Sequence, residues 1–172
     1  SYIDYYAAQI YIARNGDWPE SNYAIWRTRK SEESVYGDCK WRWMLFDVNS
    51  GALSVDGVDE DTLLYVLERD VVFNSLYQNE EFRGKFARRL LYIGKETFAE
   101  ERYQKLLDDY SQRMREPVAI GCLRFYNNSK RNEFDQNIEN IRLFFEKRYD
   151  AVWDSLVNNM GKEWLEKNGI QK

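Results

Sequence analysis

Helical periodicity over the C-terminal two thirds of the chain constrains the fold most. From about Asp59 onward, apolar residues recur mostly every three or four positions, which is the spacing of one buried face of a helix. The clearest runs are Phe82, Phe86, Leu90 and Ile93, then Ala99, Tyr103, Leu106, Tyr110 and Met114, and finally Phe134, Ile138, Ile141, Phe145, Val152 and Leu156. We therefore expect a helical body.

Glycine, proline and capping residues set the predicted ends of these helices. Gly94 follows the first run, at the position of a C-cap glycine. Thr97 and Glu100 have the spacing of a capping box, which predicts that the next helix begins there. Pro117 is expected to end that helix, and the last long helix is expected over residues 132–161.

The N-terminal third has a different pattern. Residues 3–13 have the periodicity of a short helix, whereas residues 23–26 and 41–46 are rich in the aromatic and branched side chains typical of strands. A polar stretch, residues 29–40, separates the two strands and predicts a long solvated loop. The predicted fold class is mainly α with a small β-hairpin. The length of 172 residues predicts a single domain.

Composition excludes several classes of function. The chain has no histidine, which excludes Ser-His-Asp and Cys-His catalysis and histidine-ligated zinc. A hydrophobic content of 44% argues against intrinsic disorder. The net charge of −4 argues against a broad nucleic-acid-binding surface, because phosphate contacts need clustered Lys and Arg. No apolar run approaches the roughly 20 residues that cross a bilayer, so no transmembrane segment is expected.

Three oxygen-bearing side chains lie next to the predicted hairpin. Asp17 and Asn22 precede it, and Asp47 follows its second strand. Carboxylate and carboxamide oxygens are ligands that Mg²⁺ and Mn²⁺ prefer. Asp and Asn are also among the commonest turn residues, so spacing alone leaves a purely structural role open.

The order of these parts favours catalysis. An Asp, four intervening residues, an Asn, a hairpin and a second Asp is the layout of the catalytic and metal-binding loops of protein kinases. Such loops position the reactants and neutralise charge in the phosphoryl-transfer transition state. The layout therefore indicates phosphoryl transfer.

Three segments around these side chains, residues 15–22, 26–27 and 41–47, form a recognisable pattern, and residues 82–86 and 142–148 add weaker matches. On these segments the sequence resembles the spore-coat protein H (CotH) family of secreted or surface-associated atypical kinases. The resemblance covers most of the chain.

This resemblance implies a fold and a set of roles. The chain would be a kinase-like C-terminal lobe of a larger protein whose N-terminal lobe is absent. Asp17 would be the catalytic Asp, and Asn22 and Asp47 would bind Mg²⁺ or Mn²⁺. The full-length parent would use ATP to phosphorylate protein hydroxyls at an extracellular, cell-surface or spore-coat location. We expect the single lobe to be inactive, because half a cleft does not clamp a nucleotide.

Two positions depart from the kinase pattern. Asp47 is followed by Val48 and Asn49 rather than by Phe and Gly, and Asn15 stands where kinases have the loop histidine. Neither departure removes a proposed metal ligand.

The tryptophans near the hairpin support a rival interpretation. Trp18, Trp26, Trp41 and Trp43 lie within 26 positions, 18–43. Such residues are expected mainly in the core, but exposed rings also stack on sugars. The alternative function is a non-catalytic surface or coat-assembly module that binds protein or polysaccharide through this hairpin.

Two further expectations concern Arg27 and the cysteines. Arg27 is the best of several hairpin basic residues to contact a phosphate or substrate, although an ordinary edge charge is the other interpretation. Cys39 is expected to be exposed and Cys122 buried. A disulfide between Cys39 and Cys122 stays open.

Overall fold

The computed structural model describes residues 1–48, 53–126 and 131–172, and within these ranges it is mostly helical. The elements are α1 (Tyr2–Tyr11), β1 (Ala24–Trp26), β2 (Arg42–Met44), the 3₁₀ turn η1 (Val55–Gly57), α2 (Thr62–Arg69), α3 (Val71–Tyr77), α4 (Glu80–Tyr92), the π turn η2 (Ile93–Thr97), α5 (Glu100–Phe125), α6 (Arg131–Met160) and α7 (Lys162–Lys167). The predicted class, mainly α with a small β-hairpin, is confirmed.

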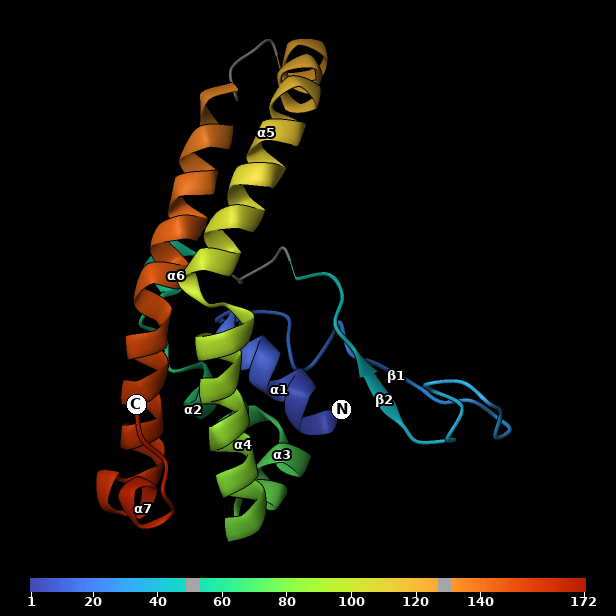
Figure 1. The fold of residues 1–172 in the computed structure, drawn as a ribbon, viewed down its shortest axis with the longest axis vertical. Coiled ribbons are helices and arrows are strands. Elements are labelled where there is room, and N and C mark those ends of the chain that lie inside the picture. Colours follow the sequence, from blue (N-terminus) through green and yellow to red (C-terminus); the bar gives the residue numbers. More distant parts are fainter. Residues whose placement is uncertain (49–52, 127–130) are drawn as a thin grey trace.

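A layer of helices surrounds α1. This first helix packs against α4 and also contacts α2, while α6 contacts α2, α4 and α5. The helices α5 and α6 lie side by side, and their paired ends extend beyond the body at the top of Figure 1. No helix in the described ranges is both long enough and apolar enough to cross a membrane.

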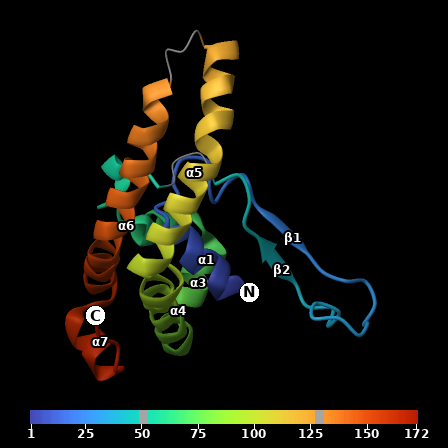
Figure 2. The same ribbon diagram turned by 45° about the horizontal axis from the view of Figure 1, so that its top comes forward.

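The hairpin is an antiparallel pair of short strands that projects from the side of the body. Ala24 pairs with Met44, Ile25 with Trp43 and Trp26 with Arg42. Figure 2 shows β1, β2 and their long loop extending away from the helices. The strands and the long polar loop predicted from the sequence are therefore confirmed. Among the elements that the structure describes, no helix covers the outer part of the hairpin.

The core is aromatic where α1 meets its neighbours. Tyr6 stacks on Phe73, with ring centroids 4.7 Å apart, and its hydroxyl donates a hydrogen bond to Asp70. Trp18 is fully buried and donates from Nε1 to the Tyr5 hydroxyl at 2.9 Å. This packing fixes the segment directly after α1, where the predicted catalytic Asp lies.

One predicted helix end is wrong, and two predicted capping arrangements do not form. Pro117 lies inside α5 instead of ending it. The helix is held there by its packing on α6. Proline has no backbone N–H to donate, but Pro117 is exposed, so the missing hydrogen bond does not leave a buried group unpaired. The capping box is not formed: Thr97 lies in the π turn η2, and α5 begins after Ala99 without a side-chain cap. The helix α4 does end beside Gly94, with Ile93 as its C-cap, but Gly94 has no positive φ and lies within η2.

Gly94 is required by close packing. A Cβ at this position would lie 2.5 Å from Tyr149 Cδ2 and 2.7 Å from Tyr11 Cε2, which no side chain tolerates. The glycine therefore lets the start of η2 approach both α1 and α6.

Candidate functional site

Asp17 and Asn22 lie together on the loop between α1 and β1. One carboxylate oxygen of Asp17 accepts a hydrogen bond from Arg14 Nη2 at 3.0 Å, and the other accepts from Asn22 Nδ2. The structure therefore brings together two of the three side chains selected from the sequence.

The pairing orients the Asn22 amide. A carboxylate only accepts hydrogen bonds, so the amide nitrogen of Asn22 faces Asp17 and its carbonyl oxygen, Oδ1, points elsewhere. Asn22 has a left-handed backbone, with a φ of 51°, which Asn adopts more readily than most residues. The carboxamide oxygen is thus available as a ligand for a cation.

Asp47 lies on a separate loop that is joined to the first one by Arg14. Arg14 Nη1 donates to the backbone carbonyl of Phe46 at 3.2 Å, directly before Asp47. Asp47 is exposed, has a φ of 50°, and its carboxylate makes no hydrogen bond or ion pair with the described residues. An unengaged carboxylate on a constrained backbone fits a ligand role.

Several contacts hold the Asp17 loop in place. The Asp17 backbone carbonyl accepts from the Ser21 hydroxyl at 2.7 Å, and the Gly16 carbonyl accepts from the Tyr65 hydroxyl at 3.4 Å. The Asn15 side chain donates to Glu60. Together with the burial of Trp18, these hydrogen bonds hold the backbone of the loop in one position.

Asn22 and Asp47 each carry the donor chemistry that suits a magnesium-type ion that keeps several waters. Asn22 Oδ1 and the Asp47 carboxylate are oxygen ligands of the kind Mg²⁺ and Mn²⁺ take. Across residues 1–48, 53–126 and 131–172, no group of three or more Asp, Glu or Cys side chains is placed to hold a metal ion. A cation at these loops would therefore rely on one carboxamide, on carboxylates and on water, as Mg²⁺ commonly does in phosphoryl-transfer sites.

Arg27 lies on the hairpin. Its guanidinium carbon is 4.7 Å from the centre of the Trp41 ring, in a cation–π contact. Its phosphate-binding role stays a prediction, because this contact belongs to the hairpin and not to the Asp17 loop.

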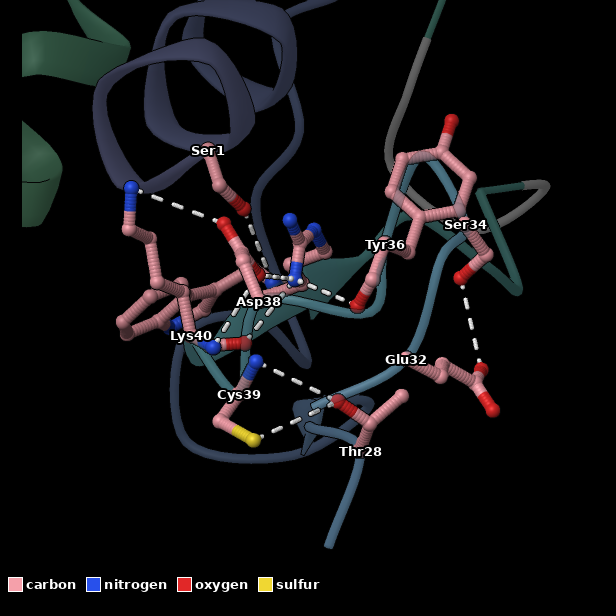
Figure 3. Close-up of polar contacts among 10 residues, drawn as sticks. Ser1, Thr28, Glu32, Ser34, Tyr36, Asp38, Cys39 and Lys40 are labelled. Carbon is pink, nitrogen blue, oxygen red and sulfur yellow. Dashed lines mark hydrogen bonds and ion pairs between the residues drawn. The ribbon is translucent and has the colours of Figure 1, made fainter. Parts of the chain in front are cut away.

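The loop of the hairpin is organised by polar contacts. Figure 3 shows the Cys39 amide and thiol facing the Thr28 hydroxyl, which accepts from the Cys39 backbone N–H at 3.2 Å. Arg42 forms an ion pair with Asp38 at 2.8 Å. This hydrogen bond and a second one from the Lys40 backbone N–H lower the pKa of Asp38 to about 2.

An open groove separates the hairpin from the start of α1. It has a volume of about 960 Å³, and aromatic side chains supply much of its wall: Tyr2, Tyr5, Trp26, Tyr36, Trp41 and Trp43. Trp26 and Trp41 remain 37% and 48% exposed, so the expectation that these rings are core residues is wrong for both. The reason is that a two-stranded hairpin has no second layer to cover them.

The cysteines are partly as expected. Cys122 is buried, Cys39 is half-buried rather than exposed, and both are free thiols.

Two buried arginines were missed from the sequence, and one of them, Arg14, contributes to the site. Arg14 joins the Asp17 loop to Phe46, as described above. Arg148, on α6, donates to the backbone carbonyls of Ile10 and Tyr11 at 2.8 Å each. Burial lowers the pKa of Arg148 to about 10, which leaves it charged at neutral pH.

The sequence shows where the two arginines stand but not that they are buried. Arg14 directly precedes the Asn15-Gly16-Asp17 segment, and Arg148 lies in the last segment that carries the family resemblance. A position in the sequence does not tell whether an arginine is buried or solvated, because burial depends on which backbone carbonyls the fold brings close to its guanidinium.

Comparison with protein families identifies the group to which these loops belong. The model of the family described as CotH kinase protein matches residues 1–152, which include α1, the hairpin and both loops. The chain belongs to the CotH kinase family. Comparisons with curated proteins and with solved structures gave no match. Asp17, Asn22 and Asp47 all lie inside the part of this CotH-like chain that the family covers.

Proposed function

We propose that this chain is the C-terminal lobe of an atypical CotH-like protein kinase, which transfers the γ-phosphoryl group of ATP to a protein hydroxyl in the full-length parent. The observation that carries the proposal is the paired Asp17 and Asn22, tied through Arg14 to the residue before Asp47. Membership of the CotH kinase family supports it.

Each residue has a distinct part in the proposed reaction. Asp17 accepts the proton of the acceptor hydroxyl while the hydroxyl oxygen forms a bond to the γ-phosphorus and the bond to the leaving diphosphate oxygen breaks. Asn22 and Asp47 would hold Mg²⁺ or Mn²⁺. The ion supplies positive charge that neutralises the phosphate oxygens. Arg27 is a second, weaker candidate for contact with a phosphate.

The decisive experiment compares conservative variants of the parent kinase. Asp17→Asn keeps a hydrogen-bond acceptor for the buried Arg14, and Asp47→Asn keeps a residue that tolerates a positive φ. Each is expected to lower the rate of phosphoryl transfer by at least about 100-fold, because proton acceptance and charge neutralisation each contribute that much. ATP-dependent phosphorylation with Mn²⁺ and the melting temperature are both measured.

The matched control is Asp38→Asn. Asp38 is an aspartate on the hairpin, paired with Arg42 and outside both loops. It is expected to retain phosphoryl transfer. Near-wild-type rates in both Asp17→Asn and Asp47→Asn would refute the catalytic assignment.

A second function is favoured by the exposed aromatic groove. Trp26, Trp41 and the groove beside α1 offer ring faces that suit stacking on a sugar or packing on a protein. In this alternative the chain is a non-catalytic module at the cell surface or spore coat that binds protein or polysaccharide.

The two functions are separated by opposite mutational patterns. For a binding module, Trp26→Ala and Trp41→Ala weaken binding of defined oligosaccharides or coat proteins, followed by tryptophan fluorescence, while Asp17→Asn and Asp47→Asn have no effect. For a kinase lobe, the aspartate variants lose activity. Loss of phosphoryl transfer in the aspartate variants with unchanged binding in the tryptophan variants rejects the module.

A further inference from the structure

One buried side chain spans the two loops of the proposed site. Arg14 is 0% exposed. Its Nη2 donates to the Asp17 carboxylate at 3.0 Å and its Nη1 donates to the Phe46 carbonyl at 3.2 Å. The two partners are 29 positions apart in the sequence, between residues 17 and 46, so this guanidinium is a tertiary link and not a local contact.

The shape of the guanidinium makes the link rigid. Its donors are held in a planar fork, so the two contacts fix both the separation and the relative orientation of the groups they bind. Because Asn22 engages the other carboxylate oxygen, Asp17 is held from two sides. The Phe46 contact places the backbone that leads directly into Asp47.

We infer that Arg14 is a positioning residue of the metal and phosphoryl-transfer site, which sets the distance between Asp47 and the Asp17–Asn22 pair. This inference rests on the proposed function, because it assumes that Asn22 and Asp47 bind one ion. Arg14 itself does not touch the ion or the substrate.

Arg148 provides a matched structural control. It is also a buried arginine, 1% exposed, and it also donates to backbone carbonyls, in this case those of Ile10 and Tyr11. None of its hydrogen bonds reaches the Asp17 loop or the segment before Asp47. A general loss of packing would affect both arginines alike, whereas loss of positioning affects Arg14 alone.

The test is Mn²⁺ binding to the 172-residue chain, with MnCl₂ as the probe and the free ion measured by electron paramagnetic resonance. Arg14→Lys keeps the charge but has no planar fork, so it is expected to weaken Mn²⁺ affinity about 10-fold or more, the usual effect of removing an outer support of a metal ligand. Arg148→Lys is expected to lower the melting temperature and to leave Mn²⁺ affinity within about 2-fold, because none of the Arg148 hydrogen bonds goes to Asp17 or to Phe46.

A second variant pair covers the case in which Arg14→Lys does not fold. Asp17→Asn is compared with the double variant Arg14→Met with Asp17→Asn, which removes the buried charge together with its partner. Weaker Mn²⁺ binding in the double variant than in Asp17→Asn alone supports the inference, because the difference reports the Phe46 contact.

Two results would overturn the inference, and they differ in what else they reject. If Asp47→Asn weakens Mn²⁺ binding but both comparisons at Arg14 show equal affinities, Arg14 is only structural and the proposed function stands. If Asp47→Asn binds Mn²⁺ as the unmodified chain does, the metal site of the proposed function is itself wrong and the role of Arg14 fails with it.

Discussion

The helical body and the hairpin differ in how far they bury tryptophan side chains. Trp18, in the loop after α1, is fully buried and hydrogen-bonded, whereas Trp26 and Trp41 on the hairpin stay 37% and 48% exposed. All three lie within 24 positions of the chain, 18–41. Burial here depends on a second layer of structure and not on the residue type.

The two regions also differ in how they are stabilised. The body buries apolar side chains from several helices in one cluster that includes Tyr6, Phe73 and Leu90. The hairpin has two strands of three residues each, and a short isolated hairpin is marginally stable in water. The hairpin contacts the body through Trp43 among others, and the ring centroids of Trp43 and Tyr2 are 4.8 Å apart. We therefore expect the hairpin to depend on the body more than the body depends on the hairpin.

The largest expected effect is on the free energy of unfolding, and it is measured with one tryptophan substitution in the body and one on the hairpin. Trp18→Ala removes a fully buried ring and is expected to lower the free energy of unfolding by about 3–5 kcal/mol. Trp26→Ala removes a half-exposed ring and is expected to change it by no more than about 0.5 kcal/mol. Urea unfolding followed by circular dichroism measures both. Equal losses would mean that the hairpin is part of the cooperative core.

The next effect concerns buried tyrosines of the body. Burial raises the pKa of Tyr6, Tyr11 and Tyr77 above the ordinary value of 10.0. Because the unfolded chain loses these protons first, the stabilisation is complete below pH 10.0 and is lost as the pH rises above it. The loss is about 1.4 kcal/mol per tyrosine for each pH unit.

Phenolate absorbance and far-ultraviolet circular dichroism, recorded against pH, test this behaviour. Exposed tyrosines such as Tyr92 and Tyr110 also contribute to the absorbance, so the part of the signal that is missing in Tyr11→Phe is the informative one. That part is expected to change together with the circular dichroism, since the buried tyrosines ionise on unfolding. Tyr11→Phe provides the control, because it removes one ionisable group and makes the stability less sensitive to alkaline pH. Ionisation of these residues in a chain that is still fully helical would disprove the linkage.

The smallest effect lies on the hairpin. The hydrogen bond from Arg42 lowers the pKa of Asp38 to about 2, below the ordinary 3.8. The contact is therefore fully present above pH 3.8 and is lost as the pH falls through about 2. Carboxyl titration by nuclear magnetic resonance is expected to show the low pKa, and Arg42→Gln to raise it. An unchanged pKa in Arg42→Gln would show that Arg42 does not hold this carboxylate.

The helices were predictable from the sequence, but several of their ends were not. Apolar spacing identified the long helices because a buried face recurs with the helical period. Pro117 and Gly94 misled because the rules for helix ends describe local backbone preferences, which tertiary packing overrides here. In the structure, α5 continues through Pro117 beside α6, and Gly94 serves a close approach to Tyr11 and Tyr149.

The site was predictable in part. Asp17 and Asn22 are five positions apart on one loop, so a turn was enough to bring them together, and the structure pairs them. The Phe46 carbonyl reaches the same guanidinium only through the fold. Arg14 and Arg148 carried no recognisable signal, since a buried arginine and a solvated one are identical in sequence.

The amino-acid sequence by itself determined the helical class, the hairpin, the kind of oxygen donors and the absence of histidine chemistry, because these follow from local spacing and composition. Only the tertiary structure decided which tryptophans are covered, why Gly94 lacks a side chain, and that Arg14 joins two loops. These properties depend on contacts between segments that are far apart in the sequence. Which groups meet in such contacts is decided by how the helices and the hairpin pack.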